Sequence, residues 1–157
     1  MAQKNMIDGE IPVQVFLPPS GTGPGLVLVQ EIVGASSYIQ TRAADLAALG
    51  YVVAVPQLYW RIGLVATPEE GEDMLAQAMA ASGSLPWGDA VGDTARTVTW
   101  VRKRSDVVGG VGLIGFCYGG GVAFAAAAQV TPDVLISYYG SALPRLLDLA
   151  PQVQIPS

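Results

Sequence analysis

The chain has 157 residues, of which 51% are hydrophobic and 13% are charged, and its net charge is −5. This length corresponds to about one domain, and the apolar content is ample for a folded core. The negative charge and a pI near 4.4 argue against a protein that binds the phosphate backbone of nucleic acids. We therefore expect a single folded domain over residues 1–157 that has no nucleic-acid partner.

The first third of the chain predicts a crossover unit of strand, helix and strand. Residues 11–17 alternate apolar and polar side chains, which indicates a half-buried edge strand. Residues 26–30 form a continuous apolar run, typical of a buried parallel strand. Apolar residues at helical spacing over 39–47 predict a helix that ends at Gly50, and 51–56 is a second buried strand.

The remainder continues the alternation of strands and helices. We expect a loop at 56–66, a helix at 68–82, a helix capped by Asp89, a strand at 111–116, a helix at 120–130, a strand at 133–140 and a short helix at 143–149. The acidic residues at the start of 68–82 would lie in the first turn, where the helix dipole favours them. The pattern predicts an α/β fold with a mainly parallel sheet flanked by helices.

Composition also limits the cellular locations and the cofactors that we expect for the protein. A single cysteine cannot form an internal disulfide framework, which favours a reducing, cytoplasmic setting. No apolar signal segment is seen at the N-terminus, and the densest apolar run, 122–128, falls far short of the roughly 20 residues that span a bilayer. With no histidine and no tight carboxylate cluster, we expect no metal site, no cofactor and no membrane partner.

The stretch "GLIGFCYGG", residues 112–120, places the only cysteine, Cys117, between a predicted strand and a predicted helix. Gly115 and Gly119 flank it at the spacing of a nucleophile elbow, with cysteine in place of serine. The N-terminus of the helix favours the thiolate, and the Tyr118 amide can face a developing oxyanion. The alternative is a buried structural cysteine. The overlapping "GVGLIG" runs along the strand rather than opening a helix, which argues against a dinucleotide site.

Two further candidates follow buried strands at the same predicted edge of the sheet. Glu31, in "QEIVG", comes directly after the strand at 26–30, and its carboxylate faces either solvent or the crevice. Arg61, in "PQLYWR", follows the strand at 51–56. A guanidinium there can hold an anionic substrate through two hydrogen bonds, or it can be a surface arginine on a loop.

These three motifs, in this order, resemble the dienelactone hydrolases, which are α/β-hydrolases with a cysteine–histidine–aspartate triad. The resemblance implies that Cys117 is the nucleophile and that the amides of Ile32 and Tyr118 form the oxyanion hole. It implies that Glu31 bonds the resting thiol and can take its proton, and that Arg61 contacts a substrate carboxylate. The implied reaction cleaves a small lactone or ester, anionic in character, through a thioester.

The resemblance also implies elements that the chain does not contain. In that family the triad aspartate and histidine follow later strands, whereas this chain ends at Ser157 and has no histidine. We therefore expect a domain without its C-terminal strands and an unpaired apolar edge at "VLISYY". A separate chain supplying the remainder, a non-catalytic or interaction fragment, and a redox-sensing thiol remain alternatives.

Overall fold

A computed structural model describes residues 2–157. The strands are β1 (Gln3–Ile7), β2 (Ile11–Phe16), β3 (Gly23–Val29), β4 (Val52–Pro56), β5 (Val107–Phe116) and β6 (Val134–Tyr138). The α-helices are α1 (Ser37–Ala48), α2 (Met74–Ser84), α3 (Trp87–Val101) and α4 (Tyr118–Val130). Short 3-10 helices are η1 (Leu58–Ile62), η2 (Leu143–Arg145) and η3 (Leu147–Gln152).

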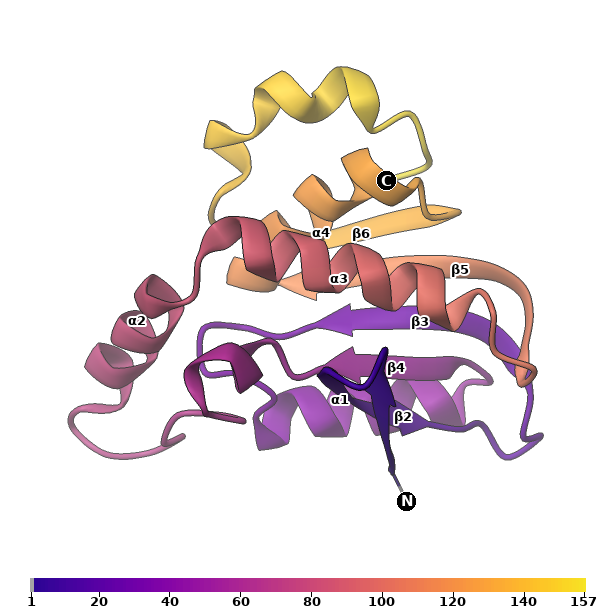
Figure 1. Cartoon of the computed structure of the whole chain (residues 1–157), viewed down its shortest axis with the longest axis horizontal. Coiled ribbons are helices and arrows are strands. Elements are labelled where there is room, and N and C mark those ends of the chain that lie inside the picture. Colours follow the sequence, from indigo (N-terminus) through magenta and orange to yellow (C-terminus); the bar gives the residue numbers. More distant parts are fainter. Residues whose placement is uncertain (1) are drawn as a thin grey trace.

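The strands form one sheet in the order β1-β2-β4-β3-β5-β6. The four strands from β4 to β6 are parallel, and β2 joins β4 in the antiparallel sense, as does β1 with β2. Parallel strands present their carboxyl ends at one edge, so the arrowheads of β3 and β4 point to the same side in Figure 1. The segments after β3, β4, β5 and β6 therefore meet at that edge.

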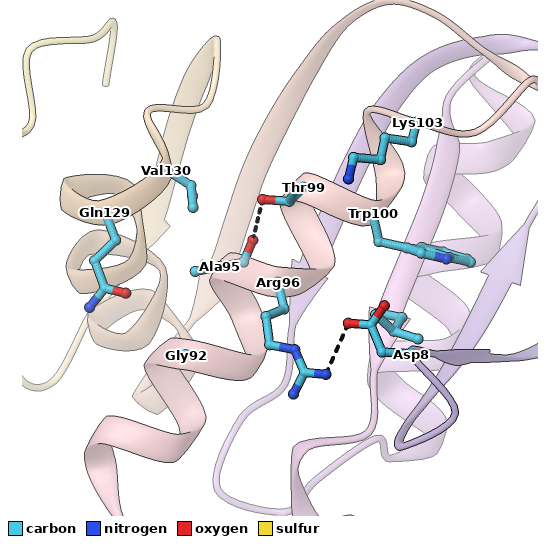
Figure 2. A pocket seen from close by; sticks show the side chains of 10 residues that line it. Asp8, Gly92, Ala95, Arg96, Thr99, Trp100, Lys103, Gln129 and Val130 are labelled. Carbon is cyan, nitrogen blue, oxygen red and sulfur yellow. Dashed lines mark hydrogen bonds and ion pairs between the residues drawn. The ribbon is translucent and has the colours of Figure 1, made fainter.

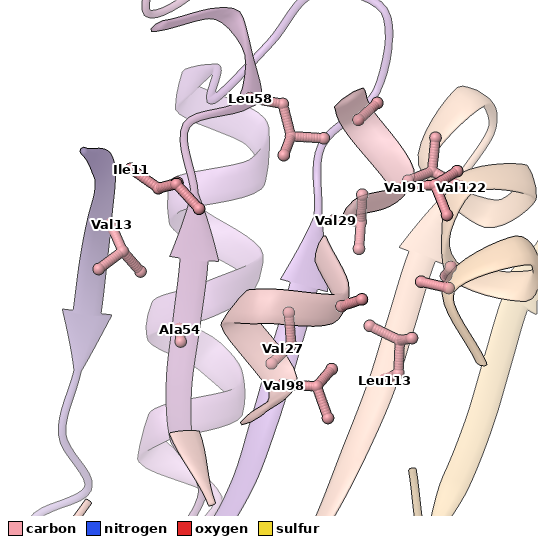
Figure 3. Packing of buried hydrophobic residues seen from close by; sticks show 14 of the residues in the cluster. Ile11, Val13, Val27, Val29, Ala54, Leu58, Val91, Val98, Leu113 and Val122 are labelled. Carbon is pink, nitrogen blue, oxygen red and sulfur yellow. The ribbon is translucent and has the colours of Figure 1, made fainter. Parts of the chain in front are cut away.

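Helices cover both faces of the sheet, and each face has its own apolar core. Alternate residues of the strands pack against α3 and α4 on one face, where Val27, Val98 and Leu113 are fully buried (Figure 3). The other face packs against α1 through Leu28 and Ile39. The strands buried on both faces are the continuous apolar runs of the sequence, as expected for a parallel sheet. The predicted α/β fold is confirmed.

Several predicted boundaries were wrong for identifiable reasons. The strand at 11–16 is not an edge, because β1 pairs with its outer side through a tight turn in which Asp8 and Gly9 both have positive φ. The helix predicted at 68–82 begins only at Met74. The acidic segment before it contacts α1 instead, where the Glu69 carboxylate accepts a hydrogen bond from the Ser37 N–H at 2.7 Å.

The next helix also begins earlier than predicted. α3 starts at Trp87 after Pro86, so Asp89 lies inside the first turn and is not the N-cap. A negative charge is favourable at either position because it faces the positive end of the helix dipole. At the far edge of the sheet, β6 pairs with β5 and with no other strand among residues 2–157. The C-terminal tail returns to this edge, where the Leu135 N–H donates to the Pro156 carbonyl at 3.0 Å.

Candidate active site

Cys117 lies on a sharp turn between β5 and α4 and has backbone angles of φ 53° and ψ −117°. A positive φ is strained for a residue with a side chain and is found mainly where neighbouring structure enforces it. The neighbours here are two glycines at points of close approach. A Cβ on Gly115 would lie 2.0 Å from the Gly119 carbonyl oxygen, and one on Gly119 would lie 2.3 Å from that of Gln30. Only glycine fits at either position.

Backbone hydrogen bonds tie the Cys117 turn to the segment that follows β6. The Cys117 N–H donates to the Tyr138 carbonyl at 2.9 Å, and its carbonyl accepts from the Ser141 N–H at 3.2 Å. The carbonyl also accepts from the Gly120 N–H at 3.0 Å inside the first turn of α4. The thiol is free and partly exposed. The sulfur is thus held on a rigid turn within reach of solvent.

Glu31 and Ile32 follow β3, the strand next to β5, and both are partly exposed. The Glu31 carboxylate accepts a hydrogen bond from the Tyr139 hydroxyl at 3.1 Å. The Ile32 carbonyl accepts from the buried Tyr59 hydroxyl, and burial raises the pKa of Tyr59 well above its usual value. This bond holds the peptide group between Ile32 and Val33. Within residues 2–157 the Ile32 N–H, which belongs to the preceding peptide group, has no backbone acceptor.

Arg61 lies on η1, directly after β4, and its side chain is 30% exposed. Its Nε and Nη2 donate to the two carboxylate oxygens of Asp93 on α3, at 2.9 Å each. Asp93 is buried, and Trp60 Nε1 also donates to it at 3.0 Å. The hydrogen bond to Asp93 raises the pKa of Arg61 further. Two of the five N–H donors of the guanidinium are therefore occupied within the chain.

All five residues singled out by the sequence lie at or just beyond the carboxyl edge of the sheet. Glu31 and Cys117 come from the adjacent strands β3 and β5, and Arg61 follows β4 on the far side of β3. Sequence reasoning missed Asp93 and Tyr139, which bond Arg61 and Glu31. Tyr139 stands in the "YYG" segment at the end of the strand predicted at 133–140, which indicates its position but not its partner. Asp93 carries no such signal, since its burial depends on how α3 packs on η1.

A hollow of about 450 Å³ lies elsewhere, between the first hairpin, α3 and α4, and Figure 2 shows its lining. None of the five predicted site residues lines it. Its guanidinium, on Arg96, pairs with Asp8 at 2.9 Å and Glu10 at 3.1 Å. The Thr99 hydroxyl in its wall donates to the Ala95 carbonyl, and Cys117 lies outside the hollow, so the edge after β5 is the better candidate for the site.

Two further findings concern residues 2–157 as described. No group of three or more potential metal ligands comes together among them. None of their helices combines the length and the apolar character needed to cross a bilayer.

Comparison with known proteins gives the chain a family. The model of the dienelactone hydrolase family matches residues 11–157. The chain belongs to the dienelactone hydrolase family. A carboxymethylenebutenolidase from a Pseudomonas species is 32% identical over 150 residues, which cover 95% of this chain and 63% of that protein. The corresponding protein of Pseudomonas putida is 31% identical and is covered to 60%. The chain thus spans about three-fifths of the length of these relatives.

Solved structures give the same fold. A dienelactone hydrolase from Anabaena variabilis superposes with a TM-score of 0.68 at 18% identity, over 99% of this chain and 69% of that one. A dienelactone hydrolase-like promiscuous phosphotriesterase from metagenomic libraries gives a TM-score of 0.72 at 20% identity, over 99% and 65%. The fold is therefore that of an α/β-hydrolase, with a mixed, mostly parallel sheet. Neither the family match nor these relatives supports a separate chain supplying further strands, and a non-catalytic fragment is not favoured.

Proposed function

We propose that the protein hydrolyses a lactone or carboxylic ester and that Cys117 is the nucleophile. The observation that carries this proposal is the Cys117 turn: a non-glycine residue at φ 53°, between a strand and a helix, in a chain of the dienelactone hydrolase family. A nucleophile on such a turn projects from the end of the sheet. Structural cysteines need no strained backbone, so the strain supports a reactive one.

The proposed reaction is acyl transfer to sulfur followed by hydrolysis. The thiolate attacks the carbonyl carbon, an S–C bond forms, and the C–O bond breaks, with the alcohol oxygen taking up the proton that the thiol released. Water then attacks the thioester carbonyl, the S–C bond breaks, and the acid and the free thiol are formed. Glu31, after the neighbouring strand, is the candidate acceptor of the thiol proton within these residues.

The same turn supplies candidate donors for the oxyanion. As the first residue of α4, Tyr118 has an N–H without an intrahelical partner, and this N–H belongs to the positive end of the helix. The Ile32 N–H is the second candidate, because it follows the neighbouring strand β3 and has no backbone acceptor within residues 2–157. Removing one such donor typically costs 10²–10³ in kcat.

Arg61 is proposed to contact a carboxylate on the substrate. Asp93 occupies two of its five N–H donors and leaves the three others for a ligand. Fixing the guanidinium in advance reduces the entropy lost when the ligand binds. The proposed substrate is therefore a small anionic lactone or ester, and we propose a cytoplasmic location because the single thiol must stay reduced.

The test is hydrolysis of a dienelactone and of p-nitrophenyl acetate by the protein and by its Cys117→Ala variant. We expect the variant to lose at least 10³-fold in kcat/KM, because the covalent route is removed. Cys117→Ser is the matched variant: it keeps a nucleophilic oxygen and separates the loss of sulfur from damage to the turn. Undiminished hydrolysis by the alanine variant would contradict the proposal.

A further inference from the structure

The chain segment after β6 lies directly against the Cys117 turn. Tyr138 and Ser141 bond the backbone of Cys117 from either side, so Tyr139 is held next to it. Tyr139 itself has a positive φ of 41°, which is strained for an aromatic residue. The residue lies just after β6, is 63% exposed, and has its ring centroid 6.0 Å from that of Phe116.

The register of the sheet places three residues at one level. Val29 of β3 pairs with Gly115 of β5, and Gly115 pairs with Ser137 of β6. Two positions further along each chain stand Glu31, Cys117 and Tyr139. Cys117 is therefore in the middle, with Glu31 on one side and Tyr139 on the other.

The outer two residues nevertheless bond each other. The Tyr139 hydroxyl donates to Glu31 Oε1 at 3.1 Å. Because β3 and β6 are separated by β5, this bond spans the end of β5, where the Cys117 turn lies. Partial desolvation and, after it, the bond to Glu31 raise the pKa of Tyr139 well above its usual value, so the phenol keeps the proton it donates.

We propose that Tyr139 is a positioning residue whose hydroxyl holds the Glu31 carboxylate across the Cys117 turn. The Tyr139–Glu31 pair covers the approach to the sulfur, and an incoming acyl group must part the two side chains. The catalytic relevance of this inference rests on the proposed function, whereas its test does not require the protein to be a hydrolase.

The test measures access to the sulfur by alkylation. Cys117 is the only cysteine, so any thiol reaction reports on this turn alone. The rates with bulky N-phenylmaleimide and with small iodoacetamide are compared as a ratio, because the same thiolate attacks both reagents and its population cancels. Tyr139→Phe keeps the ring and removes the hydroxyl, Glu31→Ala removes the acceptor, and a third variant carries both changes.

We expect each single variant to raise the ratio by about three- to tenfold, the equivalent of one net hydrogen bond. The double variant should match the singles, because either change already breaks the pair. Tyr138→Phe is the matched control: this neighbouring tyrosine stacks on Phe116 at 5.1 Å and should leave the ratio unchanged. Thermal unfolding of each variant shows whether the fold is retained.

An unchanged ratio in Tyr139→Phe, or additive effects in the double variant, would overturn the proposal. An equal rise in Tyr138→Phe would also overturn it, since the effect would then come from general loosening of the segment. Alkylation needs no turnover. Undiminished hydrolysis by Cys117→Ala would therefore refute the proposed function without bearing on the positioning role of Tyr139.

Discussion

Tyr118 shows how a single residue of the site can cost stability. It opens α4 with its ring buried and edge-on to Trp87, at 5.7 Å between centroids. Its hydroxyl is buried and has no hydrogen-bond partner within residues 2–157. Burial raises the pKa of Tyr118 to about 12. A buried polar group without a partner is unfavourable, and its ionised form is more so.

Tyr118→Phe should therefore stabilise the protein, by about 1 kcal/mol at pH 7, because it removes the unpaired hydroxyl. The folded-state pKa lies above the unfolded value of 10.0, so the neutral form is the one that the fold favours. Stability from this group is present below pH 10 and is lost as the pH rises toward about 12. The gain from Tyr118→Phe should be larger at pH 11 than at pH 7 in urea unfolding. If Tyr118→Phe raised the free energy of unfolding equally at pH 7 and pH 11, this prediction would be wrong.

At the scale of elements, one buried carboxylate fastens η1 to α3. Asp93 accepts hydrogen bonds from Trp60 and from two nitrogens of Arg61, whose guanidinium also stacks on the Trp60 ring at 4.8 Å. η1 makes no side-chain cap of its own. The short helix that carries Arg61 thus owes its position to a charge on a different element. The buried carboxylate in turn needs Arg61 to compensate its desolvation.

Asp93→Asn keeps the shape of the side chain and removes its charge. We expect it to lower the free energy of unfolding by about 2 kcal/mol, somewhat less than a fully buried ion pair because Arg61 is 30% exposed. Asp45→Asn is the matched control. It breaks the exposed pair with Arg42 and should cost less than about 0.5 kcal/mol. Equal losses in the two variants, measured by urea unfolding, would rule out a special role for Asp93.

The elements differ in how much of them could be predicted from sequence. β3, β4 and β5 follow from continuous apolar runs, and the glycines around Cys117 indicate a tight strand-to-helix turn. The placement of Glu31 at the same edge follows from parallel strand ends. The partners of these residues could not be predicted. Tyr139 bonds Glu31 across an intervening strand, and Glu69, predicted in the first turn of a helix, instead accepts a hydrogen bond from the start of α1. Both contacts depend on packing between distant segments.

At the scale of the whole molecule, the two edges of the sheet differ. β1 is a short strand with mostly exposed polar residues, including Lys4, which discourages pairing with another chain. β6 is apolar. Its Ile136 and Tyr138 pair in register with Ile114 and Phe116, on the face that α1 covers further along the sheet, and they remain 37% and 49% exposed. The tail contributes one backbone bond to the β6 edge, from Leu135 to Pro156.

An apolar edge with this little cover is a template for a second copy of the chain. We expect the 157-residue chain to self-associate as its concentration rises, and Ile136→Lys to weaken this association about tenfold, since a charge there must be desolvated on pairing. Leu49→Lys is the matched control, because Leu49 is more exposed, at 75%, but lies at the end of α1. Sedimentation velocity over a concentration series measures both. If the two lysines weaken association equally, net charge rather than the β6 edge governs it.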